Sequence, residues 1–308
     1  MPRSLFSSAP PAPAAMLICL SVVLLAVGCG HVGKPQVIYL ARHGQTDWNH
    51  KARLQGDPDL DPVGYINRLG LWQLLKDRPI HSVYTSERLR TRRTAELVAR
   101  QHKLTVQTRA TLNEIDPGVF EGICFSQLVP ARARPRDRAC EVEPRGSNPE
   151  ATLRRARPTF KKAWSDRIDG KLPLGQSFRE IATQTDRFVD ELAHGLNGRE
   201  VLVVGHGVVN RALLHHLMKW PLETVTRLRQ ENDQVYRVEG AREGAPRLFL
   251  HTPGVGWRRC QSAAPRPGQR YLDCHPRPTP PARQPPSAPG PVEEPEEKPR
   301  PAATQPAV

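Results

Sequence analysis

Two short apolar runs, each followed by His-Gly, constrain the fold of this chain more than any other feature. Residues 36–41 read Gln-Val-Ile-Tyr-Leu-Ala, and residues 200–205 read Glu-Val-Leu-Val-Val-Gly. Aliphatic, β-branched runs of this length predict buried strands. Polar residues follow each run, at Arg42–Gly44 and at His206–Gly207. Because open α/β sheets bind ligands at the carboxyl ends of their strands, the pattern predicts a site where these two strands end.

Helical patterns separate further strand-like runs along the chain. Asp61 is placed to cap a helix, and Ser177 with Glu180 forms the capping-box pattern of another. The expected strands are 36–41, 80–84, 200–205, 234–239 and 247–251, and the expected helices are 61–75, 88–102, 151–164, 177–196 and 208–218. This alternation predicts an α/β fold: a three-layer sandwich with a mostly parallel central sheet and helices on both faces.

The segment 123–174 interrupts this alternation and is rich in Arg and Pro. Between Arg132 and Lys171 it carries 12 basic and 6 acidic residues, within a chain whose net charge is +14. We interpret it as a basic lid inserted above the sheet edge rather than as a second core. The lid attracts a polyanion or an anionic membrane, or it is simply a solvated basic face. Basic residues do not alternate with aromatic ones, so a nucleic-acid partner is not expected.

The N-terminus resembles an export signal. Residues 14–27 are apolar but short for a membrane span, and Gly28 precedes Cys29 as in the lipobox of bacterial lipoproteins. We therefore expect a signal peptide over 1–28, a lipidated Cys29 and a tether over 29–34. The protein would then be an extracytoplasmic, membrane-anchored lipoprotein, facing the periplasm in a Gram-negative cell. A cleaved secreted protein, an uncleaved anchor and a cytosolic protein are the alternatives.

Composition changes again after Thr252, and the domain is therefore expected to span 35–252. Fifteen of the 32 prolines lie in 253–308, which predicts a largely disordered tail. Four cysteines remain outside the leader and the lipid site. Their spacing favours two local disulfides among three possible connectivities, and four buried thiols are the alternative. The favoured pairs are Cys124–Cys140 and Cys260–Cys274.

Cationic and titratable residues from separate segments are expected to meet at the sheet edge. Arg42 and His43 follow the first strand, His206 follows the last parallel one, and Arg90 lies one turn into a helix after another strand. Together they suit a tetrahedral oxyanion, because an Arg fork donates two charge-assisted hydrogen bonds. Glu114 lies in a loop that reaches the same edge. Arg90 competes with its neighbours at 88, 92 and 93 for this position, and Glu114 competes with the carboxylates at 116 and 121.

These residues fall in blocks that resemble one family. The blocks are Arg-His-Gly-Gln-Thr at 42–46 with Asn49 shortly after, the segment 84–95 around Arg90, Leu-Asn-Glu-Ile-Asp-Pro-Gly-Val-Phe-Glu-Gly at 112–122, and Leu-Val-Val-Gly-His-Gly at 202–207 continuing to Arg211. In this order they resemble the histidine phosphatase superfamily, also called the phosphoglycerate mutase-like family, over about 35–252. Gln176 stands where that family commonly has Glu, so the role of that carboxylate is not carried over.

The resemblance implies a metal-independent phosphomonoesterase without a cofactor, acting on a small phosphorylated substrate or a phosphoprotein. His43 would be the nucleophile that becomes phosphohistidine, and Glu114 would be the proton donor. The implied phosphate ligands are Arg42, Asn49, Arg90, His206 and Gly207. Two alternatives stay open: a catalytically inactive phosphate-binding or polyanion-binding lipoprotein, and a mutase, which an extracytoplasmic location disfavours. The substrate is not specified.

Overall fold

The computed structural model describes residues 36–129, 140, 149–195, 199–241, 244 and 246–275. The predicted signal peptide, Cys29, the tether and the tail beyond His275 lie outside these residues. So do 130–139 and 141–148 within the predicted lid. In the described part of the chain, no helix combines the length and the apolar character that a membrane crossing requires.

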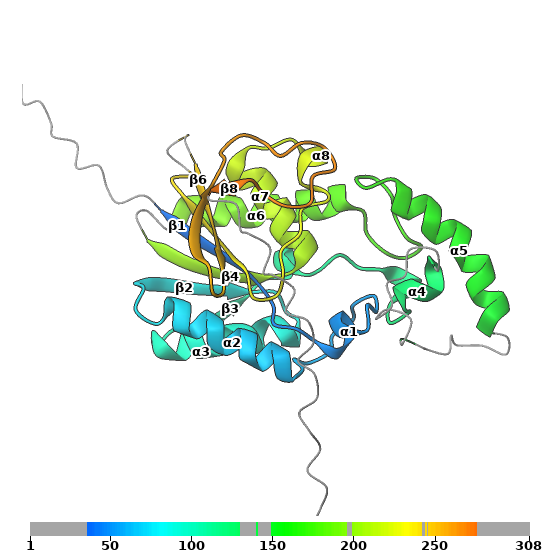
Figure 1. Ribbon diagram of the computed structural model, residues 1–308, viewed down its shortest axis with the longest axis horizontal. Coiled ribbons are helices and arrows are strands. Elements are labelled where there is room, and N and C mark those ends of the chain that lie inside the picture. Colours follow the sequence, from blue (N-terminus) through cyan, green and yellow to red (C-terminus); the bar gives the residue numbers. More distant parts are fainter. Residues whose placement is uncertain are drawn as a thin grey trace, which may run out of the picture. The chain divides into compact units, whose positions relative to one another are not determined.

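Eight strands form one sheet in the order β3-β2-β4-β1-β5-β6-β7-β8 (Figure 1). The strands are β1 (Val37–Arg42), β2 (Ile80–Thr85), β3 (Val106–Thr108), β4 (Glu200–Gly205), β5 (Val235–Glu239), β6 (Arg247–Thr252), β7 (Gly256–Cys260) and β8 (Cys274–His275). The first four strands in this order pair in parallel, and β5 to β8 are added antiparallel beside β1. The predicted parallel sheet is thus the site-bearing half of a mixed sheet.

The register of β1 and β4 decides where the site lies. The two strands are parallel neighbours, and Arg42 is opposite Gly205. The two His-Gly turns therefore leave the sheet side by side at the same edge. The backbone N–H of His43 continues the pairing by donating to the carbonyl of Gly205 over 3.0 Å.

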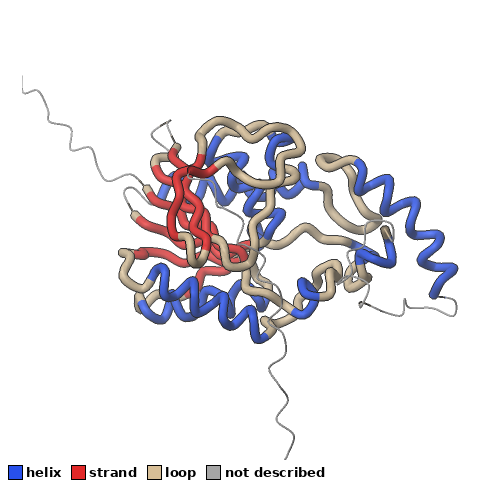
Figure 2. Tube along the Cα trace, in the orientation of Figure 1, coloured by secondary structure: helices blue, strands red, loops and turns tan. Residues whose placement is uncertain are grey.

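Helices cover both faces of the sheet, as Figures 1 and 2 show. The helices are α1 (Asp47–His50), α2 (Pro62–Leu75), α3 (Leu89–Gln101), α4 (Phe125–Leu128), α5 (Pro149–Ser165), α6 (Phe178–Gly195), α7 (Gly207–Met218) and α8 (Leu222–Val225), with 3-10 turns at Ala110–Leu112 and Gly118–Phe120. Alternate β1 residues belong to different cores. Ile38 and Leu40 pack with residues of α6 and α7, whereas Tyr39 and Ala41 pack with residues of α2 and α3. Both faces of β1 are buried, which confirms the predicted three-layer α/β sandwich.

The capping residues predicted from the sequence begin the helices as expected. Asp61 accepts a hydrogen bond from the backbone N–H of Gly64 at the start of α2, over 2.8 Å. Ser177 Oγ accepts from the backbone of Glu180, and Glu180 accepts in return from the backbone of Ser177. These bonds satisfy N–H groups that a helix start leaves without partners.

The segment 123–174 differs from its prediction because it contains a core of its own. Phe120, Leu128, Leu153 and Phe160 are buried together, and Phe160 stacks on Trp164 with 5.4 Å between ring centroids. The interpretation as a lid without a second core is therefore wrong. The aromatic residues that build this core are spread over separate segments. The core could therefore not be predicted from the hydrophobic periodicity of any one segment.

The fold also continues past Thr252, where we had placed its end. Strands β7 and β8 extend the sheet, and a disulfide joins Cys260 to Cys274 on these two strands. A second disulfide joins Cys124 to Cys140. Both favoured cysteine pairs are thus present. Gly and Pro on either side of β7 obscured its strand character, and the prediction that 253–275 belongs to the tail is wrong.

Candidate active site

The side chain of His43 is held in one tautomer by its own loop. It is buried, with 1% of its surface exposed, directly after β1. Its Nδ1 lies 2.8 Å from the carbonyl oxygen of Gly44. Because a carbonyl can only accept a hydrogen bond, Nδ1 carries the proton and Nε2 carries the lone pair. His43 is therefore arranged as a neutral nucleophile.

His206 lies beside His43 but has both ring nitrogens occupied. The two rings are 5.2 Å apart between centroids. Arg90 Nη2 lies 3.2 Å from His206 Nδ1, and a guanidinium can only donate, so Nδ1 accepts. Nε2 then carries the proton and lies 2.8 Å from Ser86 Oγ, to which it donates. His206 is a hydrogen-bond donor in this arrangement and has no lone pair to offer.

Arg90 is distinguished from the neighbouring arginines by its burial. Its side chain is fully buried in the first turn of α3, whereas Arg92 and Arg93 are exposed. Its Nη1 donates to the carbonyl of Gly56 over 2.5 Å and lies 3.7 Å from a carboxylate oxygen of Asp57. Its Nε is buried and has no hydrogen-bond partner among the residues that the structure describes. A buried N–H without a partner is costly, and an anion would supply the acceptor.

Arg42 repeats the pattern seen at Arg90. Its Nη1 donates to the carbonyl of Gln230 over 3.0 Å, and its Nε is buried without a hydrogen-bond partner in the described part of the chain. A Cβ added to Gly207 would lie 3.7 Å from this Nε, so the guanidinium lies against the start of α7. The first backbone N–H groups of a helix favour an anion at such a place. Arg42 and Gly207 are therefore placed together, as predicted.

Glu114 is the carboxylic acid of this group. It is partly buried, Oε1 accepts from the backbone N–H of Ile115 over 3.0 Å, and the charges of Arg90 and Arg42 act on it. The competing acids Asp116 and Glu121 are both exposed. The structure therefore favours Glu114 as the acid of the site.

Burial and the arginine charges set the protonation states. Burial, followed by the charges of Arg90 and Arg42, lowers the pKa of His43 well below its usual range. Burial and Arg90 do the same to the pKa of His206. Burial raises the pKa of Glu114, although Arg90 opposes the change. The pKa of Arg90 falls to about 10 through burial, so the guanidinium stays charged. The site thus combines neutral histidines, charged arginines and a carboxyl group that retains its proton more readily than usual.

Comparison with known proteins agrees with this geometry. The sequence profile of the histidine phosphatase superfamily (branch 1) matches residues 38–167 and 145–249. The chain belongs to this superfamily. A Klebsiella pneumoniae protein named "probable phosphoglycerate mutase GpmB" is 28% identical over 205 residues, covering 66% of this chain and 84% of that protein.

Two solved structures show the same fold. An α-ribazole phosphatase from Shigella flexneri has a TM-score of 0.52 at 21% identity, covering 66% of this chain and 89% of the other. A mycobacterial glucosyl-3-phosphoglycerate phosphatase has a TM-score of 0.51 at 22% identity, covering 72% and 96%. At these identities the likeness concerns the fold of this chain and not its substrate.

Asn49, predicted as a phosphate ligand, uses its side-chain oxygen to hold the loop after His43. Its Oδ1 accepts from the backbone N–H of Thr46, and Thr46 Oγ1 accepts from the backbone of Asn49, which makes a capping box for α1. Only Nδ2 is left as the side-chain donor toward a ligand. Asn49 primarily shapes the loop after His43.

Three further residues of the site escaped the sequence prediction. Ser86 accepts from His206, as described above. Gln230 anchors Arg42 and also donates from Nε2 to the carbonyl of Leu40 over 2.8 Å. Arg211 donates to the carbonyls of Gly207 and Thr226, and its charge acts on Glu114. A signal for Arg211 was present, because it is a charged residue within the apolar run of α7.

The described residues show no cluster of three or more His, Cys, Asp or Glu side chains that could hold a metal ion. Positive charge in the site comes from Arg42, Arg90 and Arg211.

Proposed function

We propose that this histidine phosphatase is a phosphomonoesterase that hydrolyses phosphate esters through a phosphohistidine at His43. One observation carries the proposal: His43 Nδ1 faces the carbonyl of Gly44, which leaves the lone pair on Nε2, and the charges of Arg90 and Arg42 act on this ring. The buried Nε atoms of both arginines have no hydrogen-bond partner among the described residues. A phosphoryl group in this place would give both Nε atoms an acceptor. The arginine forks of Arg42 and Arg90 then stabilise the charge on its oxygens.

In the first step, Nε2 of His43 attacks phosphorus and the bond from phosphorus to the ester oxygen breaks. Glu114 gives its proton to that oxygen, so the leaving group departs as an alcohol. The raised pKa of Glu114 favours the protonated form that this step needs. The products are phosphohistidine, the carboxylate of Glu114 and the free alcohol.

In the second step, water attacks phosphorus while the carboxylate of Glu114 accepts a proton from it. The bond from phosphorus to nitrogen breaks and inorganic phosphate leaves. His43 returns to its neutral form, which its lowered pKa favours. Splitting the reaction in two lets one carboxyl group act first as acid and then as base.

The test is release of phosphate from an aryl phosphate in the presence of a chelator. Wild type should release phosphate, and His43→Ala should not. His81→Ala is the matched control, because His81 is exposed at the other end of β2 and should retain full activity. Wild-type release no faster than that of His43→Ala would contradict the proposal. Phosphate binding without any release would support an inactive phosphate-binding protein.

A mutase is the second candidate, favoured by the name of the Klebsiella relative. In a mutase, phosphohistidine returns its phosphoryl group to an organic acceptor instead of water. Incubation with 3-phosphoglycerate separates the two activities. Release of inorganic phosphate supports the phosphatase, and formation of 2-phosphoglycerate without release supports the mutase.

We also propose that the protein is exported and anchored through a lipid on Cys29. The two disulfides support export, since such bonds persist in oxidising compartments. Cys29→Ser should move the protein from the membrane fraction to the soluble fraction, with Cys19→Ser as the control that stays on the membrane. Unchanged partitioning of Cys29→Ser would contradict the anchor.

A further inference from the structure

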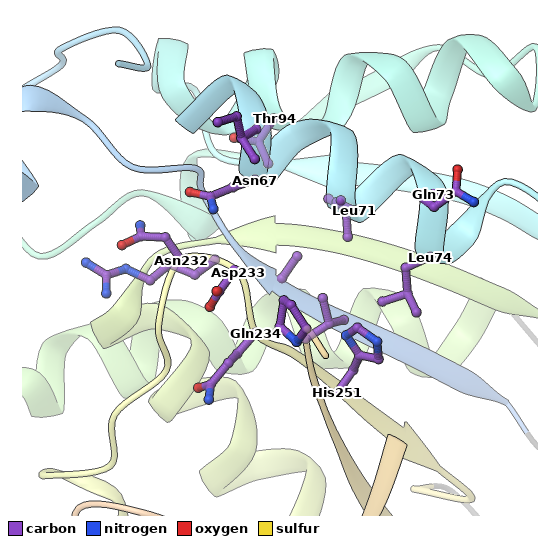
Figure 3. Close-up of a pocket in the computed structure, with 15 residues that line it drawn as sticks. Asn67, Leu71, Gln73, Leu74, Thr94, Asn232, Asp233, Gln234 and His251 are labelled. Atoms are coloured by element: carbon purple, nitrogen blue, oxygen red, sulfur yellow. The ribbon is translucent and has the colours of Figure 1, made fainter. Parts of the chain in front are cut away.

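A cavity of about 450 Å³ lies behind the loop that carries His43. It is lined by residues of α2, of the end of β1 and of the ends of β5 and β6, and it opens to solvent beside the exposed Ile66 and Asp233. Figure 3 shows Leu71 and Leu74 on α2 facing His251 on β6 across this space. Its volume falls within the range of about 300–1,000 Å³ that is typical of small-molecule sites. Of the residues described above in the active site, Arg42 also lines the cavity.

Three side chains that line the cavity also bind the backbone of residues 43–45, which we call the nucleophile loop. Asn232 Nδ2 donates to the carbonyl of His43 over 2.7 Å. Thr94 Oγ1 accepts from the N–H of Gly44 over 2.8 Å, and Asn67 Oδ1 accepts from the N–H of Gln45 over 3.0 Å. Three successive residues of the loop are thus fixed by the wall of the cavity. Figure 3 shows these three side chains on the side of the cavity nearest the loop.

The remaining polar groups of the cavity select the ligand. Asp233 contributes an exposed carboxylate at the edge of the cavity, and the half-buried ring of His251 lines its wall. Burial lowers the pKa of His251, with Asp233 acting in the opposite direction, which favours a neutral ring. The guanidinium of Arg42 lies near Gly207 on the catalytic side. These groups suit a hydrogen-bond donor that carries positive charge, and they disfavour an anion.

Apolar side chains provide the rest of the lining. Leu71 and Leu74 come from α2, Val235 begins β5, and Pro253 follows β6. A ligand with an apolar body would bury that body on these residues while its cationic end reaches Asp233. Burial of apolar area is the main source of affinity for such a ligand.

We propose that this cavity is a second ligand site, for a small organic cation with an apolar body, and that its occupant acts on the nucleophile loop through Asn67, Thr94 and Asn232. A ligand there changes the affinity of the active site for phosphate, because the same three side chains contact both the cavity and the loop. By linkage, phosphate changes the affinity for the cation by the same factor. The site is independent of whether the enzyme hydrolyses or transfers phosphate.

Gly70 offers a variant that narrows the cavity without touching the active site. It is an exposed residue of α2 that lines the cavity, and a Cβ added there would have no atom within 4 Å. Gly70→Leu places a branched side chain at the edge of the cavity, and Gly70→Ala is its matched control. Both replace Gly within a helix, so both variants should fold and gain stability of about 1 kcal/mol or less.

Binding is tested with 2-phenylethylammonium by thermal unfolding, with 2-phenylethanol and phenylacetate as probes of similar shape. The ammonium should raise the midpoint of wild type and Gly70→Ala by about 3 °C at saturating concentration. It should leave Gly70→Leu unchanged, and phenylacetate should have no effect. No shift in wild type, or an equal shift in Gly70→Leu, would overturn the site. An equal or larger shift with phenylacetate would overturn the assigned ligand class.

Coupling is tested by titrating inorganic phosphate calorimetrically with and without the ammonium. The phosphate affinity of wild type should change by at least about 5-fold, the lower end of typical coupling between sites. Gly70→Leu should show no such change. Binding of the ammonium without any change in phosphate affinity would overturn the coupling. Because the readout is phosphate binding, a failure of the hydrolysis assay would not imitate this result.

Discussion

The two His-Gly segments share this dipeptide, follow neighbouring parallel strands and lie at the same sheet edge, yet their histidines have different hydrogen-bond partners. His43 gives only Nδ1 to the protein, at the carbonyl of Gly44. His206 gives both nitrogens, one to Arg90 and one to Ser86. The His-Gly motif places a histidine at the sheet edge, and the hydrogen-bond partners of that histidine determine its tautomer. Nε2 of His43 therefore carries a lone pair, whereas Nε2 of His206 carries a proton.

The partners come from different parts of the chain, which explains the asymmetry. The carbonyl that fixes His43 belongs to the next residue, so this tautomer is local to the turn. Arg90 and Ser86, which fix His206, belong to the segment after β2, the strand beside β4. Because β1 has β5 as its other neighbour, the segment before β5 reaches His43, and its Asn232 binds the backbone carbonyl of His43 rather than the ring.

Removal of each histidine in turn is the strongest test of this comparison. His43→Ala removes the nucleophile and should lower kcat by roughly 10⁴- to 10⁶-fold. His206→Ala removes the acceptor that positions Arg90 and should lower kcat by about 10²- to 10³-fold. Steady-state hydrolysis of an aryl phosphate measures both. Equal losses, or a larger loss in His206→Ala, would mean that the two turns are equivalent or reversed.

Glu114→Gln tests whether Glu114 protonates the leaving oxygen when His43 attacks phosphorus. The variant cannot protonate the leaving oxygen, so kcat/KM for an alkyl phosphate should fall by about 10²- to 10⁴-fold. A para-nitrophenyl ester has a leaving group that needs no proton and should lose far less in the first step. Asp116→Asn, at an exposed carboxylate two residues away, is the control with unchanged rates. A uniform loss for both esters would contradict the acid role.

The pH dependence of stability tests the burial of the two neutral histidines. Both pKa values are lowered in the folded state, so below about pH 6.5 the unfolded chain binds protons that the folded chain does not. Each histidine therefore contributes stability that is lost as the pH falls, at up to about 1.4 kcal/mol per pH unit.

Denaturant unfolding between pH 5 and 7 measures this contribution as a difference between variants. The slope of unfolding free energy against pH should be shallower by about 1.4 kcal/mol per unit in His206→Asn than in wild type. Glu114 makes the opposite contribution, because its raised pKa favours folding at lower pH. This contribution is the same in wild type and variant, so it cancels when the two slopes are subtracted. The exposed His81→Asn should retain the wild-type slope. An unchanged slope in His206→Asn would contradict the neutral, buried state.

Much of the framework could be predicted because it follows from local patterns. Uninterrupted apolar runs identified β1 and β4, and a polar cap identified the starts of α2 and α6. Their parallel pairing then placed His43 and His206 at one edge. The identity of the buried arginine was not visible in the same way. Helical spacing alone does not separate Arg90 from Arg93, and only packing against Gly56 and His206 does.

The parts that were missed depend on contacts between distant segments. The aromatic core around Phe160 consists of residues between Phe120 and Trp164. No single segment among them shows a hydrophobic periodicity that would predict this core. β7 is held by pairing with β6 and by the disulfide to Cys274, both of which are tertiary. The tautomers of the two histidines depend on hydrogen bonds that the sequence pattern does not predict.

Mapping the phosphorylated residue tests the central claim most directly. The protein is mixed with a phosphate ester, stopped in alkali, and digested, and the acid-labile phosphate is located by mass spectrometry. The account predicts phosphate on His43 in wild type and in His206→Ala, and none in His43→Ala. Phosphate on His206 instead of His43 would contradict the assignment of the nucleophile.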